Sequence, residues 1–218
     1  DAAGDAFESW AGASIEFRAG CIEKLADLVN ENAELLAKAE SKDNGKPISL
    51  ASTVDIPRSE KNLRFYATAI QHFASESHHM EGVAMNYTLR KPLGVVACIS
   101  PWNLPLYLFT WKVAPALAAG NCVVAKPSEI TPVTAYLLST WVKEAGFPDG
   151  VFNILHGLGA EVGDALVRHK KIAAVSFTGG TATGAHIASV TAPKFKKLSL
   201  ELGGKNAAII FSDCDEIP

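Results

Sequence analysis

From residue 94 onward, short apolar segments rich in β-branched residues alternate with longer segments of helical periodicity. The expected strands span residues 95–100, 121–126, 151–155, 173–177, 198–202 and 207–211, and the expected helices lie near 105–119, 132–146, 159–169 and 182–191. Strands that are apolar along their whole length suit a parallel sheet covered by helices on both faces. The alternation therefore predicts an α/β fold with a doubly wound parallel sheet, in which ligands bind where the strands end.

The first 76 residues have helical periodicity instead. Apolar residues from Ile22 to Val29 recur at the three- and four-residue spacing of one helix face. The run Asn-Gly-Lys-Pro at 44–47 is a helix stop signal, and a second helix is expected from about 53 to 74. Apolar and polar residues alternate over 83–90, as in a strand. We therefore divide the chain into a helical part (1–76), a strand or hairpin (77–93) and the sheet domain (94–218).

The composition argues against several classes of protein. A formal net charge of −3 gives no electrostatic reason to expect a nucleic-acid partner. The four cysteines lack CxxC or CxxxC spacing, so we expect no metal site, free thiols and a cytoplasmic location. The adjacent His78 and His79 are a poor metal site, and we expect them in a solvated turn. Polar residues and prolines interrupt the longest apolar stretches, so we expect no membrane span. Because the chain starts inside an expected helix without Met, we expect it to be part of a longer protein.

The loop after the first expected strand reads Ser100-Pro101-Trp102-Asn103. An Asn amide can donate hydrogen bonds to an oxyanion that develops during a reaction. The alternative is that Asn103 is the N-cap of a helix that starts near Pro105, which is a common role for this residue type.

The loop after the second strand reads Lys126-Pro127-Ser128-Glu129. A carboxylate here can accept hydrogen bonds from both hydroxyls of a ribose, and the lysine can donate to the same sugar. A carboxylate also repels a 2′-phosphate, so the arrangement favours NAD over NADP. The alternative is a surface turn with a local ion pair of little energetic value.

Two further loops are rich in glycine. The run from Gly157 through Gly159 to Gly163 is close to GxGxxG with one residue too many, and the alternative is a tight turn plus close helix packing. Phe177-Thr178-Gly179-Gly180 precedes an expected helix, where unblocked backbone N–H groups can bind a pyrophosphate. The alternative is a helix start capped by Thr.

Glu201 ends the fifth expected strand, in the run Leu200-Glu201-Leu202-Gly203-Gly204-Lys205. A carboxylate in an apolar strand is costly unless it is paired or functional, and this one could act as a general base on water. The alternative is a buried Glu satisfied by backbone amides.

Together, these loops resemble the NAD(P)-dependent aldehyde dehydrogenase superfamily over about residues 3–211. The resemblance implies a Rossmann-like fold, NAD as cofactor, an aldehyde substrate, and a homodimer or homotetramer joined through the 77–93 strand or hairpin. It implies that Asn103 forms the oxyanion site and that Glu201 is the general base. The cofactor-binding residues that we predict are Ser100, Pro101, Trp102, Lys126, Ser128, Glu129, Gly159, Phe177, Thr178, Gly179, Gly180, Leu202 and Gly203. Gly180 departs from the family, which usually has Ser there.

The resemblance also places the nucleophilic cysteine of the family beyond Pro218, because Cys214 lies too close to Glu201. We therefore expect this chain alone to be inactive as a dehydrogenase. A noncatalytic nucleotide-binding or structural remnant of the family is the alternative.

Within the superfamily, the chain is similar to the 2-aminomuconic and 2-hydroxymuconic semialdehyde dehydrogenases. The similarity rests on residues 41–46, 55–58 and 104–107. It implies the oxidation of an aldehyde that carries a carboxylate. Arg58 falls where other family members have an apolar residue in the substrate tunnel, and it could bind that carboxylate in a bidentate pair. The alternative is a surface Arg on a helix. Asn103 and Trp111 complete the substrate residues that we predict, and no metal is expected.

Overall fold

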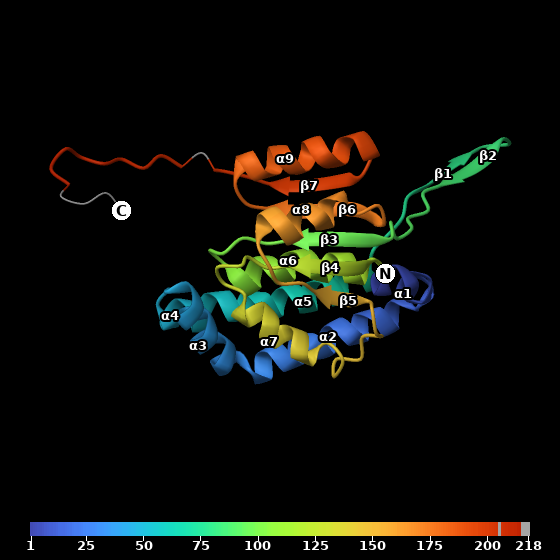
Figure 1. The fold of residues 1–218 in the computed structure, drawn as a ribbon. Helices are drawn as coiled ribbons and strands as arrows, with labels where there is room; N and C mark the ends of the chain where they lie inside the picture. The colour runs from blue at the N-terminus through green and yellow to red at the C-terminus, as the bar shows by residue number, and fades with distance from the viewer. Residues whose placement is uncertain (205, 215–218) are drawn as a thin grey trace.

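The computed structural model describes residues 1–204 and 206–214. Its centre is a five-stranded parallel sheet in the order β5-β4-β3-β6-β7 (Figure 1). The strands are β3 (Val95–Ile99), β4 (Cys122–Lys126), β5 (Phe152–Ile154), β6 (Ile172–Thr178) and β7 (Lys197–Glu201). This arrangement confirms the predicted α/β fold.

The order of the strands reverses direction beside β3. The chain runs from β3 outward to β5, returns to pair β6 with β3, and continues to β7. Because parallel crossovers are right-handed, the helices before and after the reversal lie on opposite faces of the sheet. On one face are α6 (Pro105–Ala118) and α7 (Val133–Trp141), and on the other are α8 (Asp164–Arg168) and α9 (Thr181–Thr191). The reversal opens a crevice at the carboxyl ends of β3 and β6, where such sheets bind ligands.

The expected sixth strand at 207–211 is wrong. Residues 206–211 form no strand, and Ile209 and Phe211 are 79% and 74% exposed. Figure 1 shows this segment running away from the sheet as an extended tail. An apolar run predicts a strand only where a partner strand is available for hydrogen bonding, and no described strand pairs with it. Lys205 and residues 215–218 lie outside the described residues.

The helical part packs behind α6. It comprises α1 (Ala2–Gly12), α2 (Ile15–Glu31), α3 (Ala33–Asn44), the short α4 (Ile48–Leu50), a π-helical turn η1 (Ala51–Asp55) and α5 (Ile56–Gln71). Helix α5 lies between α2 and α6. The stop signal at 44–47 is confirmed, because Gly45 takes the left-handed conformation with φ of +82°. The second helix begins earlier than expected, with helical turns from residue 48 to 71.

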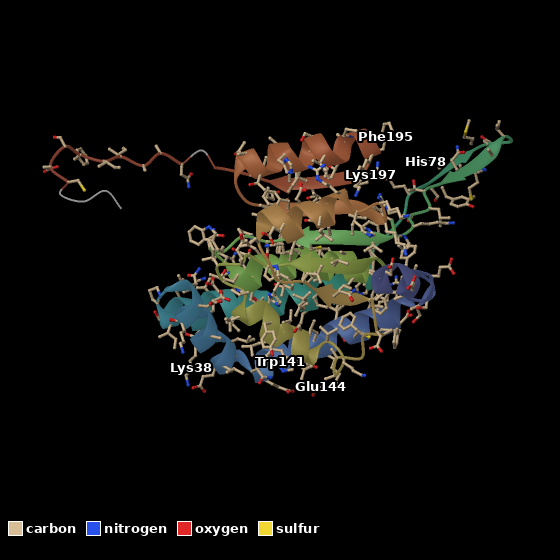
Figure 2. The ribbon with its side chains drawn as sticks, viewed as in Figure 1. Lys38, His78, Trp141, Glu144, Phe195 and Lys197 are labelled. Atoms are coloured by element: carbon tan, nitrogen blue, oxygen red, sulfur yellow. The ribbon has the colours of Figure 1, made fainter. Side chains whose placement is uncertain are left out.

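A hairpin joins the helical part to the sheet. Its strands β1 (Ser77–Met80) and β2 (Ala84–Tyr87) pair antiparallel and project from the body (Figure 1). The strand expected at 83–90 is therefore present but shorter. His78 and His79 are exposed as expected, but they lie in β1 and not in a turn, because β2 provides the partner strand. Figure 2 shows His78 on this hairpin.

Candidate functional site

A pocket of about 820 Å³ opens at the carboxyl ends of β3, β4 and β6. Its volume lies in the range of sites that bind cofactors and small molecules. The pocket brings together eleven of the predicted cofactor residues, which come from four separate loops: Ser100, Pro101, Trp102, Lys126, Ser128, Glu129, Gly159, Phe177, Thr178, Gly179 and Gly180. Its wall also contains Asp164, Arg168 and His186 from α8 and α9, which the sequence interpretation missed.

Lys126 and Glu129 form a preorganised pair in the wall of this pocket. Lys126, the last residue of β4, is 2% exposed, and its Nζ donates to Glu129 Oε2 at 2.9 Å and to the Pro127 carbonyl at 3.1 Å. The Gly159 N–H donates to Glu129 Oε1 at 3.2 Å. The hydrogen bond from Lys126, with backbone N–H groups, lowers the pKa of Glu129 to about 2. The alternative of a surface ion pair is wrong for Lys126, because its ammonium is buried.

Ser100 has an unsatisfied hydroxyl at the same pocket. Within the described residues, its Oγ is buried and has no hydrogen-bond partner. Such groups are rare in folded proteins, and each one calls for a partner. A polar ligand in the pocket would provide that partner. Three features of the pocket fit a dinucleotide: the unpaired Ser100 hydroxyl, the Lys126–Glu129 pair and the glycine-rich start of α9.

Helix α9 begins at the pocket without a side-chain cap. Its N-cap is Gly180, so the expected alternative of a Thr cap is wrong. The backbone N–H groups of the first turn therefore remain available, and with the helix dipole they favour an anion. A Cβ at Gly179 would lie 2.5 Å from Cζ of the Phe177 ring, so a larger residue where the chain leaves β6 would force this buried ring to move.

The run Gly157–Gly163 serves two purposes. Gly157 has φ of +145°, and a Cβ there would lie 2.4 Å from Val162 Cγ2, which confirms the alternative of a tight turn for this residue. Gly159 instead lies in the pocket wall and bonds Glu129.

Glu201 lies outside this pocket and is exposed, so the expected buried acid is wrong. It ends the edge strand β7, in which Leu198 and Leu200 face inward while Lys197, Ser199 and Glu201 face outward. Glu201 lines a second pocket of about 450 Å³ between β7 and α6, together with Trp111 and Tyr66.

Lys112 is a residue of this second pocket that the sequence interpretation missed. It is 6% exposed, and its Nζ donates to Ser176 Oγ at 3.4 Å. Burial lowers the pKa of Lys112, while the nearby Cys98 and Glu201 act in the opposite direction. The sequence does contain a signal for Lys112, which is a lysine within a mostly apolar expected helix. A lysine that is buried there needs a polar partner.

The remaining predicted residues lie around these pockets. Asn103 is exposed in the loop before α6, whose N-cap is Leu104 without a side-chain hydrogen bond, so the N-cap alternative for Asn103 is wrong. Leu202 and Gly203 lie beside the start of α9 and outside the larger pocket, and the Gly203 N–H donates to Thr181 Oγ1 at 3.4 Å.

Arg58 and Trp111 meet around one aromatic ring. The Arg58 guanidinium carbon lies 4.8 Å from the centre of the Tyr107 ring. Trp111 contacts Tyr107 and Tyr66 edge to face, with ring centres 6.1 and 6.2 Å apart. The structure thus places both predicted substrate residues on the α5–α6 side of the sheet, away from the larger pocket.

Over residues 1–204 and 206–214, no group of three or more His, Cys, Asp or Glu side chains could hold a metal ion. Among the helices in these ranges, none is long and apolar enough to cross a membrane. Cys21, Cys98 and Cys122 are buried free thiols.

Comparison with known proteins identifies the family. The sequence pattern of the aldehyde dehydrogenase family matches residues 1–217. The chain is 52% identical to the 2-aminomuconic semialdehyde dehydrogenase of Bos taurus over 216 residues and 54% identical to that of Danio rerio over 215. These matches cover 99% and 98% of this chain, but 44% of each relative, so the chain spans less than half their length.

Structural comparison agrees. An NAD⁺ complex of aldehyde dehydrogenase from Bacillus cereus matches 98% of this chain and 44% of that protein, with a TM-score of 0.91 and 44% identity. The family match extends over nearly the whole chain, and the solved relative has the same arrangement of strands and helices. The chain therefore belongs to the aldehyde dehydrogenase family.

Proposed function

We propose that this chain is the NAD-binding part of an enzyme that oxidises a carboxylate-bearing aldehyde, such as 2-aminomuconic semialdehyde, to the acid. The larger pocket supports the proposal, because three of its groups suit a dinucleotide. The Glu129 carboxylate suits a ribose, the uncapped N-terminus of α9 suits a pyrophosphate, and the buried Ser100 hydroxyl lacks a hydrogen-bond partner among the described residues. The relatives from Bos taurus and Danio rerio act on such a semialdehyde by name. In this proposal, the nucleophilic cysteine is supplied from outside these 218 residues, which do not complete the oxidation on their own.

Each group around the larger pocket has a role toward NAD, which supplies the hydride acceptor when bound. Glu129, ionised and held by Lys126, accepts hydrogen bonds from the ribose hydroxyls and disfavours a 2′-phosphate. The N-terminus of α9, with Thr178 and Gly180, receives the pyrophosphate. Ser100 donates its free hydroxyl to the bound dinucleotide. Leu202 and Gly203 contribute backbone at the nicotinamide end.

Two residues of this chain act on the reacting carbon. The Asn103 amide donates to the oxyanion that forms when the thiolate attacks the aldehyde. Once hydride has left for NAD and a thioester remains, Glu201, exposed at the second pocket, takes a proton from a water molecule whose oxygen bonds to the thioester carbon. The C–S bond then breaks, and the acid and the thiolate separate. The buried ammonium of Lys112 lines the same pocket, where burial lowers the pKa of Lys112 and the Glu201 carboxylate acts to raise it.

Arg58 selects the substrate by its carboxylate. Its guanidinium is exposed and lies over the face of the Tyr107 ring. This cation–π contact orients the planar guanidinium and leaves its N–H groups available to bind a carboxylate. The aromatic side chains of Tyr107, Trp111 and Tyr66 line the path beside it.

The hairpin serves for assembly. Its apolar side chains are largely exposed, with Val83 at 76%, Tyr87 at 72% and Met85 at 68%. Exposed apolar strands of this kind are covered in stable proteins by another chain. A homodimer or homotetramer of a cytoplasmic protein accounts for the hairpin and for the reduced, scattered cysteines.

The test uses the complete gene product that contains this chain. We expect NAD-dependent oxidation of 2-hydroxymuconic semialdehyde, measured by NADH formation. Replacing Arg58 with Met should raise KM for this substrate about tenfold to 100-fold and leave KM for a simple aliphatic aldehyde nearly unchanged, because a hydrogen bond to a charged group is lost.

The matched control is Arg64→Met on the same helix, whose guanidinium pairs with Asp27 and Glu60. An equal rise in KM for both aldehydes would defeat the carboxylate role of Arg58. NAD binding without oxidation of any aldehyde would support the noncatalytic alternative instead.

A further inference from the structure

The turn at the end of α3 holds the backbone of the Asn103 loop. The Asn44 side chain donates from Nδ2 to the Trp102 carbonyl at 2.7 Å. Lys46 Nζ donates to the carbonyl of Asn103 itself at 3.1 Å. Two residues from one turn therefore bind consecutive carbonyls of a loop almost 60 residues further along the chain.

Lys46 is itself fixed by two buried carboxylates. Its Nζ lies 3.2 Å from Glu40 Oε1 and 2.5 Å from Asp55 Oδ2. The side chains of Lys46, Glu40 and Asp55 are 7%, 0% and 2% exposed. A buried lysine with three oxygen partners has one orientation, since its three donors are all used. Its bond to Asn103 is correspondingly rigid.

Glu40 also replaces the missing cap of α6. Its second oxygen, Oε2, accepts from the Leu106 N–H at 3.3 Å, in the first turn of that helix. Burial raises the pKa of Glu40, while Lys46 and the Leu106 N–H lower it. Because a carboxylate from α3 caps α6, the Asn103 amide is not needed for capping. The Asn103 side chain therefore stays available to a substrate. The backbone of its loop is held by Asn44 and Lys46, and the start of α6 that follows is held by Glu40.

We propose that Lys46 and Asn44 are positioning residues that aim the Asn103 amide at the developing oxyanion, with Glu40 and Asp55 fixing Lys46. Neither residue lines either pocket, and both act through the backbone of Trp102 and Asn103. The inference rests on the proposed function, in which Asn103 stabilises the oxyanion. The turn lies at the side of the molecule to which the strand arrows point, which is also the side where the larger pocket opens (Figure 1).

The test is a double-mutant cycle in the complete gene product. Asn103→Ala should lower kcat about 100-fold or more, the usual cost of one oxyanion donor. Lys46→Met should lower kcat about tenfold or more and leave KM for NAD within about twofold, because the bond that is lost holds Asn103, outside the larger pocket, while Trp102 in the pocket wall keeps its bonds from Asn44 and Thr131. In the Asn103→Ala background, Lys46→Met should cost less than about twofold, since coupled residues are not additive.

Lys38→Met is the matched control, because Lys38 lies on α3 with its side chain 61% exposed and, among the described residues, forms its ion pair with Glu34 at the outer surface (Figure 2). Its kcat should equal that of the wild type. If Lys46→Met fails to fold because two carboxylates are left buried, Asn44→Ala decides: it should lower kcat about fivefold, and that loss should vanish in the Asn103→Ala background.

The possible results distinguish failure of the proposed function from failure of the positioning role alone. A wild-type protein without aldehyde oxidation overturns the proposed function. An active protein in which Asn103→Ala is slow, while Lys46→Met or Asn44→Ala adds its full effect to Asn103→Ala, overturns the positioning role alone. A rise in KM for NAD equal to the fall in kcat overturns it as well, because that pattern indicates general distortion of the pocket.

Discussion

Replacing Glu129 with Gln tests the ribose site at constant side-chain size. The pKa of Glu129 is about 2, against an ordinary value of 4.5, a difference that corresponds to about 3–4 kcal/mol of stabilisation before solvent screening. Because the side chain is 37% exposed, solvent screening reduces this to about 1 kcal/mol. The variant should therefore fold normally, with Tm lower by about 2–4 °C.

The larger effect should fall on the cofactor. The variant loses charge-assisted hydrogen bonds to the ribose, worth about 1.5–3 kcal/mol, so KM for NAD should rise about tenfold to 150-fold. KM for NADP should rise less or fall, because the repulsion of the 2′-phosphate is also removed. The assay is steady-state kinetics of the complete gene product with each cofactor, beside a thermal melt.

The pH dependence supplies an internal check. Since the folded pKa of Glu129 lies below its ordinary value, the stabilisation is complete above about pH 4.5 and is lost as pH falls toward 2. KM for NAD in the wild type should thus show no titration of this group between about pH 5.5 and 8. Equal increases in KM for NAD and NADP, or a wild-type KM that rises as pH falls from 7 to 5.5, would refute the reasoning.

Two further predictions concern the scaffold. Gly157→Ala should destabilise the protein by about 1–3 kcal/mol in urea unfolding, because φ of +145° and the contact with Val162 both exclude a Cβ, and an unchanged midpoint would contradict this. Cys98, whose pKa burial raises to about 12, should resist iodoacetamide at pH 8 in the native protein and react after unfolding in urea, as read by mass spectrometry; equal labelling in both states would show that the thiol is accessible.

The local pattern of residues accounts for most of the cofactor pocket. Each predicted loop follows an apolar strand, and parallel strands bring their carboxyl ends to one edge. The sequence therefore predicted that Ser100, Lys126, Gly159 and Thr178 converge, and the pocket contains all of them. Their role toward NAD stays a prediction.

Other features could not be predicted locally. The run at 207–211 has strand composition, but a strand also needs a partner, which composition does not show. Glu201 shares the exposed face of β7 with Lys197 and Ser199, and which face of a strand is covered depends on how the helices pack on the whole sheet. The cap of α6 comes from Glu40, 66 residues earlier, so the sequence around Pro105 suggested Asn103 instead.

The sequence by itself determined the α/β class, the loops that carry polar residues and the end of the helix after Asn44. These features depend on the spacing of apolar residues and on the backbone preferences of glycine and proline, which both operate within a few residues. Tertiary structure alone decided which distant groups meet. Burial converts Lys46, Glu40 and Asp55 into one network, and it places Lys112 beside Glu201. Such pairings depend on the packing of α3, α5 and α6 against each other. Their energies depend on how far each charged group is removed from water, and a short stretch of sequence does not reveal that burial.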